Sequence, residues 1–316
     1  MQIFDASATR DALPFARLIP ALRQAFAAGC ELPPRQVHAL ADASGSVCTS
    51  LIMPAWSSAD AAARHYGVKI VNIAPHNAAH GLPALHASYL LFDARSGAPL
   101  ALIDGSVLTT RRTVAASALA ASFLARGDAR RLLVVGAGAV ARQLPAAYRC
   151  VRPIEQVRVW ARAPHKAAAL AEALRAEGFD AQPAADLAAA AAQADIVSCA
   201  TLATEPLLQG HWLAPGCHLD LIGSFTPAMR EADDACFAGA ALYVDTEEAL
   251  QKSGDLLGPL SRGVIGAEQA GTLAELCRGG APGRHSAPQR TVFKSVGTAL
   301  EDLAAAVLVA QGAAPD

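Results

Sequence analysis

The sequence lacks any long apolar run, any basic stripe and any closely paired cysteines. A transmembrane helix needs about 20 consecutive apolar residues, and no segment approaches that length, so we expect no contact with a membrane. The formal net charge is −2, with acids and bases interspersed. Because a nucleic-acid-binding surface is strongly basic, we expect no nucleic-acid partner either.

The seven cysteines are irregularly spaced, and none belongs to a C-x-x-C pair. Their odd number and their spacing argue against a disulfide framework and against a zinc site. The first residues, MQIFDASATRDALPFARL, contain acids and no continuous apolar core, which argues against a secretory signal. These absences predict a cytoplasmic protein with reduced thiols.

The 316 residues are too many for one ordinary core and suit two domains. Residues 11–28 show the apolar spacing of a helix, whereas residues 47–108 contain short β-like runs, two of them separated by Ser96-Gly97. That pair predicts a hairpin turn, and the region predicts an antiparallel sheet. An alanine-rich helix is expected over residues 113–128.

After Arg131 the chain alternates between short apolar strands and alanine-rich helices. The expected strands are LLVVG, QVRVWAR, DIVSCAT, HLDLIGS and LYVDT, and one helix, PHKAAALAEALRAEG, opens with proline. The alternation predicts a parallel, doubly wound sheet with helices on both faces. The tail, residues 293–313, is expected to form one amphipathic helix that returns to the first domain.

A glycine-bearing turn joins the first of these strands to the next helix. Gly136, Gly138 and Ala141 match the G-x-G-x-x-G/A fingerprint of dinucleotide-binding (Rossmann) domains, in which small residues allow the tight turn and the close approach of a pyrophosphate. The helix N-terminus offers N–H groups to the phosphates. A merely structural turn is the alternative, but the flanking strand and helix favour a cofactor site. Its residues would be Gly136, Ala137, Gly138, Ala139, Val140 and Ala141.

The end of the second strand bears on which dinucleotide is bound. NAD-binding domains usually place an Asp or Glu there, about 20 residues after the glycines. Here Ala161 is followed by Arg162, His165 and Lys166, and cations suit the 2′-phosphate of NADP(H). We therefore favour NADP(H), with Arg162 as a ligand. NAD(H) stays open as the alternative, because the same cations also suit a solvated basic surface.

A more specific pattern covers nearly the whole chain. Its segments are GVKIVNIAPHN (67–77), GLPALHASYLLFDARSGAPLALIDGSVLTTRRTVAASALAA (81–121), GAGAVA (136–141), GSFTPAMREAD (223–233) and VFKSVGTALEDLAAA (292–306). Together they resemble the ornithine cyclodeaminase/μ-crystallin family. The resemblance implies an α/β fold in which a doubly wound Rossmann domain, residues 116–289, is inserted into an α+β substrate-binding and dimerisation domain, residues 1–115 and 290–316.

The same resemblance implies a homodimer joined through the substrate domain, and an active site in a cleft between the domains. Three cations match the family's substrate positions: Arg35, Lys69 and Arg112. The two guanidiniums would hold a substrate carboxylate bidentately, and Lys69 would be the catalytic lysine beside the imine. We expect its pKa to be lowered between two arginines. Surface ion pairs are the alternative for each cation, and Arg111 competes with Arg112.

One position departs from the family's cyclodeaminases, which carry an aspartate at the third position of a G-G-D-x-P segment. Phe225 stands there in GSFTP, and a phenyl ring accepts no proton. Ring closure with loss of ammonia is therefore disfavoured, whereas an apolar wall suits a substrate that is already cyclic. Simple packing is the alternative role for Phe225.

Other candidate site residues rest on weaker patterns. His86 is expected to line the substrate site, and Thr201 and Ser224 are placed with the cofactor-binding residues, although Thr201 equally suits a capping role. His76 and His80 are four residues apart, but no carboxylate or cysteine accompanies them, so we expect no metal site.

These observations predict an enzyme that reduces a cyclic ketimine with NAD(P)H. Δ1-Pyrroline-2-carboxylate, giving L-proline, is the first choice of substrate, and Δ1-piperideine-2-carboxylate, giving L-pipecolate, is the second. The rival enzymes are an ornithine cyclodeaminase and an alanine dehydrogenase. A crystallin-like, nucleotide-dependent binding protein is the non-enzymatic rival.

Overall fold

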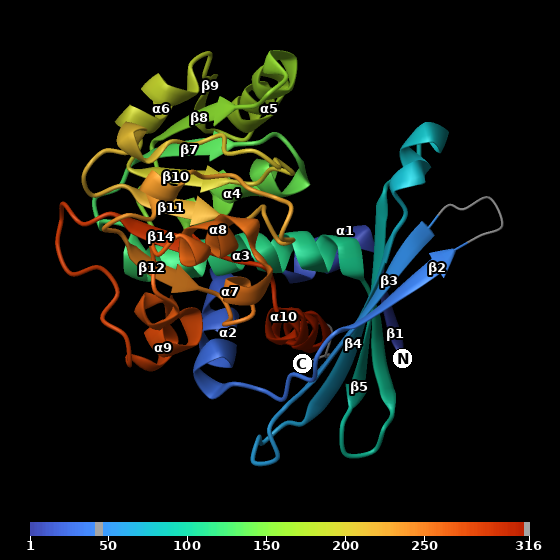
Figure 1. The fold of residues 1–316 in the computed structure, drawn as a ribbon. Helices are drawn as coiled ribbons and strands as arrows, with labels where there is room; N and C mark the ends of the chain where they lie inside the picture. The colour runs from blue at the N-terminus through green and yellow to red at the C-terminus, as the bar shows by residue number, and fades with distance from the viewer. Residues whose placement is uncertain (42–46, 313–316) are drawn as a thin grey trace. The chain divides into compact units, whose positions relative to one another are not determined.

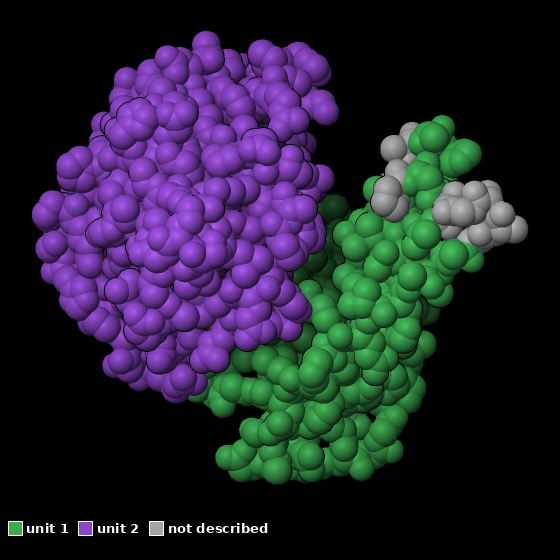
Figure 2. Space-filling view, in the orientation of Figure 1, with its two compact units in different colours: residues 1–112, 298–316 green, residues 113–297 purple. Residues whose placement is uncertain are grey.

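The computed structural model describes residues 1–41 and 47–312. The chain forms two compact units: unit 1 contains residues 1–112 and 298–316, and unit 2 contains residues 113–297 (Figure 1, Figure 2). The later boundary differs from the expected one at 289/290, because residues 291–294 form a strand of the unit 2 sheet.

Unit 1 is built on a six-stranded sheet in the order β1-β6-β5-β4-β3-β2. The strands are β1 (Gln2–Phe4), β2 (Gln36–Ala41), β3 (Val47–Trp56), β4 (His65–Ile73), β5 (Leu85–Asp93) and β6 (Pro99–Asp104). All neighbours are antiparallel except β1 and β6, which confirms the expected sheet. The β5–β6 hairpin turns at Ser96-Gly97, where Gly97 has a φ of 72°.

The helices of unit 1 are α1 (Ala6–Ala12), α2 (Phe15–Ala28) and α10 (Ala299–Gln311), with the 3-10 helix η1 (Pro75–His80). The single helix expected over 11–28 is wrong at its start. The chain breaks at Leu13-Pro14, because a residue that precedes proline is driven out of the α region. α10 packs on α2 and on one face of β3, β4, β5 and β6.

α3 (Gly105–Leu124) follows β6 directly and runs through the division between the units. The tail expected as one helix over 293–313 is instead a strand followed by α10. The segment TVFK pairs with its neighbours as a strand, and Thr298 then starts α10 by accepting the Leu300 N–H with its side chain. α10 belongs to unit 1, as expected for the returning tail.

Unit 2 contains an eight-stranded parallel sheet in the order β13-β12-β14-β11-β10-β7-β8-β9. Its strands are β7 (Arg131–Val135), β8 (Gln156–Trp160), β9 (Asp180–Pro183), β10 (Ile196–Cys199), β11 (His218–Leu221), β12 (Ala241–Val244), β13 (Gly271–Thr272) and β14 (Thr291–Lys294). The five strands expected from the sequence are β7, β8, β10, β11 and β12, which confirms the doubly wound α/β prediction.

The remaining helices of unit 2 surround this sheet. They are α4 (Ala139–Arg149), α5 (Pro164–Ala176), α6 (Leu187–Gln193), α7 (Ala249–Lys252), α8 (Gly254–Ser261) and α9 (Leu273–Arg278), with the 3-10 helices η2 (Gly210–Trp212), η3 (Asp234–Cys236) and η4 (Ala267–Gln269). No described helix of either unit is long and apolar enough to cross a bilayer.

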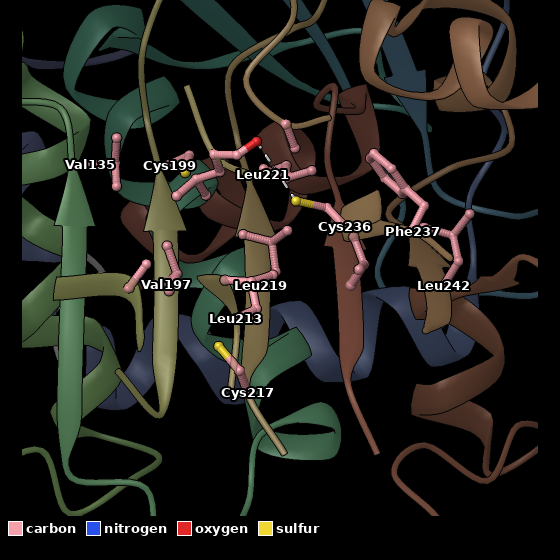
Figure 3. Packing of buried hydrophobic residues seen from close by; sticks show 14 of the residues in the cluster. Val135, Val197, Cys199, Leu213, Cys217, Leu219, Leu221, Cys236, Phe237 and Leu242 are labelled. Atoms are coloured by element: carbon pink, nitrogen blue, oxygen red, sulfur yellow. Dashed lines mark hydrogen bonds between the residues drawn. The ribbon is translucent and has the colours of Figure 1, made fainter. Parts of the chain in front are cut away.

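The core of unit 2 lies on the central strands. Val135, Val197, Leu219 and Leu221 are fully or almost fully buried, and Cys199 packs among them (Figure 3). Strands covered on both faces are apolar throughout rather than alternating, which explains why LLVV and DIVSC are recognisable in the sequence. Removing one such leucine side chain would cost about 2–5 kcal/mol.

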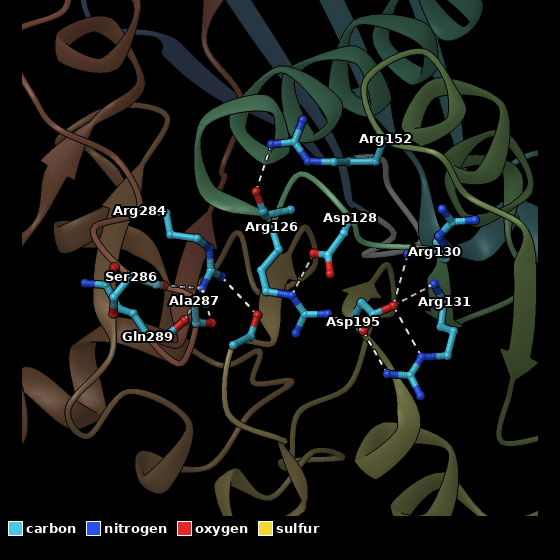
Figure 4. A network of polar contacts seen from close by, with 12 residues as sticks. Arg126, Asp128, Arg130, Arg131, Arg152, Asp195, Arg284, Ser286, Ala287 and Gln289 are labelled. Atoms are coloured by element: carbon cyan, nitrogen blue, oxygen red, sulfur yellow. Dashed lines mark hydrogen bonds and ion pairs between the residues drawn. The ribbon is translucent and has the colours of Figure 1, made fainter.

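A polar network holds the amino ends of these strands. Asp195, directly before β10, accepts the backbone N–H groups of Arg130 and Arg131 at 3.0 Å and pairs with the Arg131 and Arg126 guanidiniums at 2.8 and 3.0 Å (Figure 4). Nearby, Arg284 donates to carbonyl oxygens, including that of Leu124. The network therefore holds the amino ends of these strands, whereas the glycine turn lies at their carboxyl ends.

Candidate functional site

Two cations and two carboxylates form a buried cluster in unit 1. Lys69 Nζ lies 2.7 Å from Asp302 Oδ2, and the Arg112 guanidinium contacts Asp302 Oδ1 at 2.8 Å and Glu301 Oε2 at 2.7 Å. The side chains come from the middle of β4, from α3 and from the first turn of α10. All four residues are at most 5% exposed. Asp302 thus joins two of the three cations expected to bind substrate.

Pairing makes this burial tolerable, because an isolated buried charge is strongly disfavoured whereas a hydrogen-bonded pair offsets much of the desolvation. Burial lowers the pKa of Lys69 to about 8, against the opposing effect of Asp302, and Arg112 adds to the lowering. Burial raises the pKa of Asp302, but Arg112 and Lys69 outweigh it and hold that pKa below its usual value. The expected lowering of the Lys69 pKa is confirmed in direction, with burial rather than the arginine as its main cause.

This arrangement has two chemical capacities. An ammonium whose pKa lies near 8 can give and take a proton close to neutral pH. Arg112 uses Nε and Nη1 for its carboxylate partners, and its planar fork also carries Nη2 donors. A cluster with a guanidinium and a titratable amine suits a substrate that has both a carboxylate and an imine nitrogen.

Tyr89 lies beside this cluster and was not anticipated. It is the register partner of Lys69 on β5, so the two side chains share a face of the sheet. Its hydroxyl is buried and has no hydrogen-bond partner among the described residues, and burial raises its pKa. A side chain on Gly67 would collide with this hydroxyl. Tyr89 therefore places a buried hydroxyl over Gly67, two residues from Lys69 on the same face of β4.

The other residues considered for the substrate site are Arg35, Arg111 and His86. Arg111 donates to the Leu13 carbonyl oxygen and lies 3.9 Å from the Phe15 ring centre, so Arg112, not Arg111, joins Lys69. Arg35 is half-buried directly before β2. His86 is exposed and three residues from Tyr89, the partner of Lys69. Because side chains alternate along a strand, His86 lies on the face opposite Lys69 and is not brought to it.

In unit 2 the glycine turn has the geometry that a dinucleotide requires. Gly136 has a φ of 121°, and a side chain there would lie 2.5 Å from the Ala200 carbonyl oxygen. Gly138 caps α4, and no side chain hydrogen-bonds to the helix start, so those N–H groups can bind phosphate. Ala141 is fully buried, as a close helix–sheet contact requires. The residues present fit the pyrophosphate of a dinucleotide.

The strand order gives the direction of such a cofactor. It reverses between β7 and β10, the switch point at which open α/β sheets bind ligands beyond the carboxyl ends of their strands. A ribose bound on the β8 side meets Ala161 and the exposed Arg162 rather than an acid. The other half of a bound dinucleotide would then extend toward β10 and β11.

Thr201 and Ser224 follow β10 and β11 on that side. Thr201 donates its N–H and its hydroxyl to Glu231 Oε1, both at 2.7 Å. Ser224 has a φ of 54° and is the one non-glycine residue with positive φ in the described parts of the chain. Such strain often marks a functional site. Phe225 is 46% exposed, so packing in a core does not explain it.

Several residues were missed by the sequence analysis. They are Tyr89, Glu301, Asp302, Glu231, Asp255 and Lys294. The adjacent acids of ALEDLAAA, within an otherwise apolar helix, were a usable signal. Glu231, Asp255 and Lys294 acquire their partners only in the folded chain, because those partners lie far away in sequence. Among residues 1–41 and 47–312, no group of three His, Cys, Asp or Glu side chains is placed to hold a metal ion.

Comparisons with known proteins agree with this geometry. Residues 9–314 match the model of the ornithine cyclodeaminase/mu-crystallin family. A Delta(1)-pyrroline-2-carboxylate reductase of Paracoccus denitrificans is 47% identical over 249 residues, which cover 78% of this chain and 79% of that protein.

Two solved structures have the same fold over nearly the whole chain. The Thermococcus litoralis Delta(1)-pyrroline-2-carboxylate reductase, in complex with NADH and L-proline, has a TM-score of 0.91 at 33% identity and covers 99% of this chain and 97% of its own. An archaeal alanine dehydrogenase dimer with bound NAD has a TM-score of 0.89 at 28% identity, with 99% and 96% coverage.

Proposed function

Because the chain belongs to the ornithine cyclodeaminase/mu-crystallin family, we propose that it reduces a cyclic ketimine with a nicotinamide cofactor. Δ1-Pyrroline-2-carboxylate is the first substrate, with Δ1-piperideine-2-carboxylate as the second. The observation that carries this proposal is the buried cluster in which Asp302 joins Lys69 to Arg112. Its similarity to the Delta(1)-pyrroline-2-carboxylate reductases of Paracoccus denitrificans and Thermococcus litoralis supports it.

In the proposed reaction Arg112 and Arg35 bind the substrate carboxylate. Lys69 donates a proton or a hydrogen bond at the imine nitrogen, which removes electron density from the adjacent carbon. The nicotinamide, when bound, supplies the hydride to that carbon. Asp302 positions Lys69 and Arg112 together. His86 is left out of this role because it lies on the opposite face of the sheet.

The cofactor is proposed to bind unit 2 through residues 136–141, with Thr201 and Ser224 on the nicotinamide side. Arg162 is proposed to meet a 2′-phosphate, which would favour NADPH over NADH. The exposed position of Arg162 after β8 and the absence of an acid at Ala161 support this preference. The two similar solved structures contain NADH and NAD, so a direct comparison of NADPH with NADH is required.

Phe225 separates this proposal from the cyclodeaminase alternative. A side-chain amine of ornithine has a pKa near 10.4 and needs a nearby base before it can attack. The half-exposed ring of Phe225 supplies none. A cyclic imine presents methylene groups to this ring and needs no such base.

The deciding experiment follows oxidation of NADPH and of NADH with five- and six-membered cyclic imino acids. Pyruvate with ammonia tests for an alanine dehydrogenase, and a reaction without substrate is the control. Turnover of a cyclic imine above the other substrates supports the proposal. Cofactor binding with no turnover of any substrate would favour the nucleotide-dependent binding protein instead.

We also propose a cytoplasmic homodimer joined through the unit 1 sheet. The exposed Val37 and Val47, which share one face of the β2–β3 pair, are apolar surface that a second copy would cover. Cys30, Cys48, Cys199, Cys217 and Cys236 are free thiols, which suits a reducing compartment. Light scattering should give twice the mass of the chain, and Val37→Glu should reduce that mass toward the monomer.

A further inference from the structure

Three fully buried charged residues in unit 2 are not used by the proposed reaction. Glu231 follows the GSFTP segment, Asp255 lies in the first turn of α8, and Lys294 ends β14. Each is 0% exposed. Burying three ionisable groups is costly unless their contacts compensate, so the role of these contacts requires an explanation.

The contacts link the loops at the carboxyl ends of three strands. Lys294 Nζ donates to the carbonyl oxygens of Leu221, at 3.0 Å, and Gly223, and it lies 3.7 Å from Asp255 Oδ2. Asp255 Oδ1 accepts the Glu231 N–H at 2.8 Å. Glu231 in turn holds both donors of Thr201. The cluster therefore connects β14, the loop after β11 and the loop after β10.

The same cluster holds the strained backbone at Ser224. Ser224 Oγ accepts the Asp255 N–H at 2.9 Å and donates to the Met229 carbonyl oxygen at 2.5 Å. A side chain on Gly223 would collide with the Glu231 carboxyl and with the Thr201 carbonyl oxygen. Gly223 and Thr201 are thus held against the Glu231 carboxyl, and Ser224 is held by the Asp255 N–H and the Met229 carbonyl oxygen.

The electrostatics of the cluster are consistent with a fixed framework. Burial raises the pKa of Glu231 to about 7, while Lys294 opposes that rise and Asp255 adds to it. Glu231 Oε2 has no hydrogen-bond partner among the described residues, so half of this carboxyl is still available to a donor.

We infer that Glu231, Asp255 and Lys294 position the loops at Thr201 and at Gly223-Ser224 for the nicotinamide half of the cofactor. The inference rests on the proposed function only in taking the cofactor to be a nicotinamide dinucleotide. The glycine turn of β7 fixes the pyrophosphate, and the reversal of strand order directs the nicotinamide half toward β10 and β11. These three are positioning residues, because they act through the loops.

The test compares NADH with ADP-ribose, which lacks the nicotinamide, by calorimetry in the absence of any imine. Glu231→Ala leaves both Thr201 donors without their partner, so NADH should bind at least about fivefold more weakly while ADP-ribose changes less than twofold. Glu231→Gln keeps an acceptor oxygen and should bind NADH like the wild type. Asp195→Ala removes a buried carboxylate at the opposite edge of the sheet and is the matched control.

Melting temperatures identify variants that fail to fold. If Glu231→Ala is one of them, Asp255→Ala replaces it, because it leaves the Glu231 and Ala232 N–H groups without their acceptor, and the same preferential loss of NADH binding is expected. Equal weakening of NADH and ADP-ribose, or no weakening of either, overturns the inference. Preferential loss of NADH binding in these variants supports the inference whether or not the wild type reduces a cyclic imine. A wild type that reduces no cyclic imine would refute only the proposed reaction.

Discussion

Asp302 holds Lys69 and Arg112 with its two carboxylate oxygens, at 2.7 Å from Lys69 Nζ and 2.8 Å from Arg112 Nε. One side chain of α10 therefore sets the spacing between the proposed proton donor and the proposed carboxylate ligand. Burial excludes water from this pair of contacts, so each charge acts in a medium of low polarity. The predictions about catalysis follow from this bridge.

Replacing Lys69 by alanine removes the proposed proton donor. The kcat for imine reduction should fall by on the order of 10²–10⁴, the usual range for general acid catalysis. NADPH binding, measured by fluorescence, should persist because Lys69 lies in unit 1. Lys252→Ala, on the partly exposed pair with Glu248, is the control. Activity of Lys69→Ala within a few-fold of wild type would remove Lys69 from the mechanism.

Asp302→Asn should shift the pH dependence of the reaction. The pKa of Lys69 is about 8, and Asp302 is the main group that raises it against burial. A proton donor is lost as the pH rises through its pKa, so kcat/KM should decline above about pH 8 in the wild type. In the variant this decline should begin at a lower pH. An unchanged alkaline limb would show that another group controls it.

Arg162→Ala tests the preference for NADPH. Loss of one charge-assisted contact to a phosphate costs about 1.5–3 kcal/mol, or roughly 10- to 150-fold in affinity. The KM for NADPH should therefore rise far more than that for NADH. Arg278→Ala, at an exposed position on α9, should alter neither. Equal changes in both KM values after Arg162→Ala would refute the assignment.

Phe225 predicts that the protein releases no ammonia from L-ornithine. The ring supplies no base that could deprotonate the substrate amine, whose pKa is near 10.4. Incubation with ornithine and oxidised cofactor, assayed for ammonia and proline, measures this directly. The reduction rate of Δ1-pyrroline-2-carboxylate provides the scale. Ammonia release at a comparable rate would restore the cyclodeaminase alternative.

Asp195→Asn should destabilise the protein at neutral pH. Burial alone would raise the pKa of Asp195, but hydrogen bonds from Arg131 and Arg130 lower it to about 2 from 3.8. The stabilisation is therefore present above about pH 4 and disappears as the pH falls toward 2. We expect a loss of about 1.5–3 kcal/mol in urea unfolding at pH 7, which shrinks at pH 3. Asp128→Asn, on an exposed side chain, should have a much smaller effect.

The sequence by itself determined the parallel sheet and the cofactor turn. Strands buried on both faces are continuous apolar runs, and the turn at Gly136 needs a residue that tolerates a φ of 121°, so both leave a local signal. The sequence also contained Lys69 and Arg112 within segments that resemble a known family. These features depend on neighbours along the chain, which is why they could be predicted.

Only the tertiary structure decided which charges meet. Asp302 is 190 residues from Arg112, and Lys294 is 71 residues from Gly223, so no local pattern could pair them. The register of β4 with β5 separated His86 from Lys69 and put Tyr89 beside it instead. The pKa of Lys69 likewise follows from burial beneath α10, because desolvation depends on what the folded chain packs over a group rather than on its neighbours in sequence.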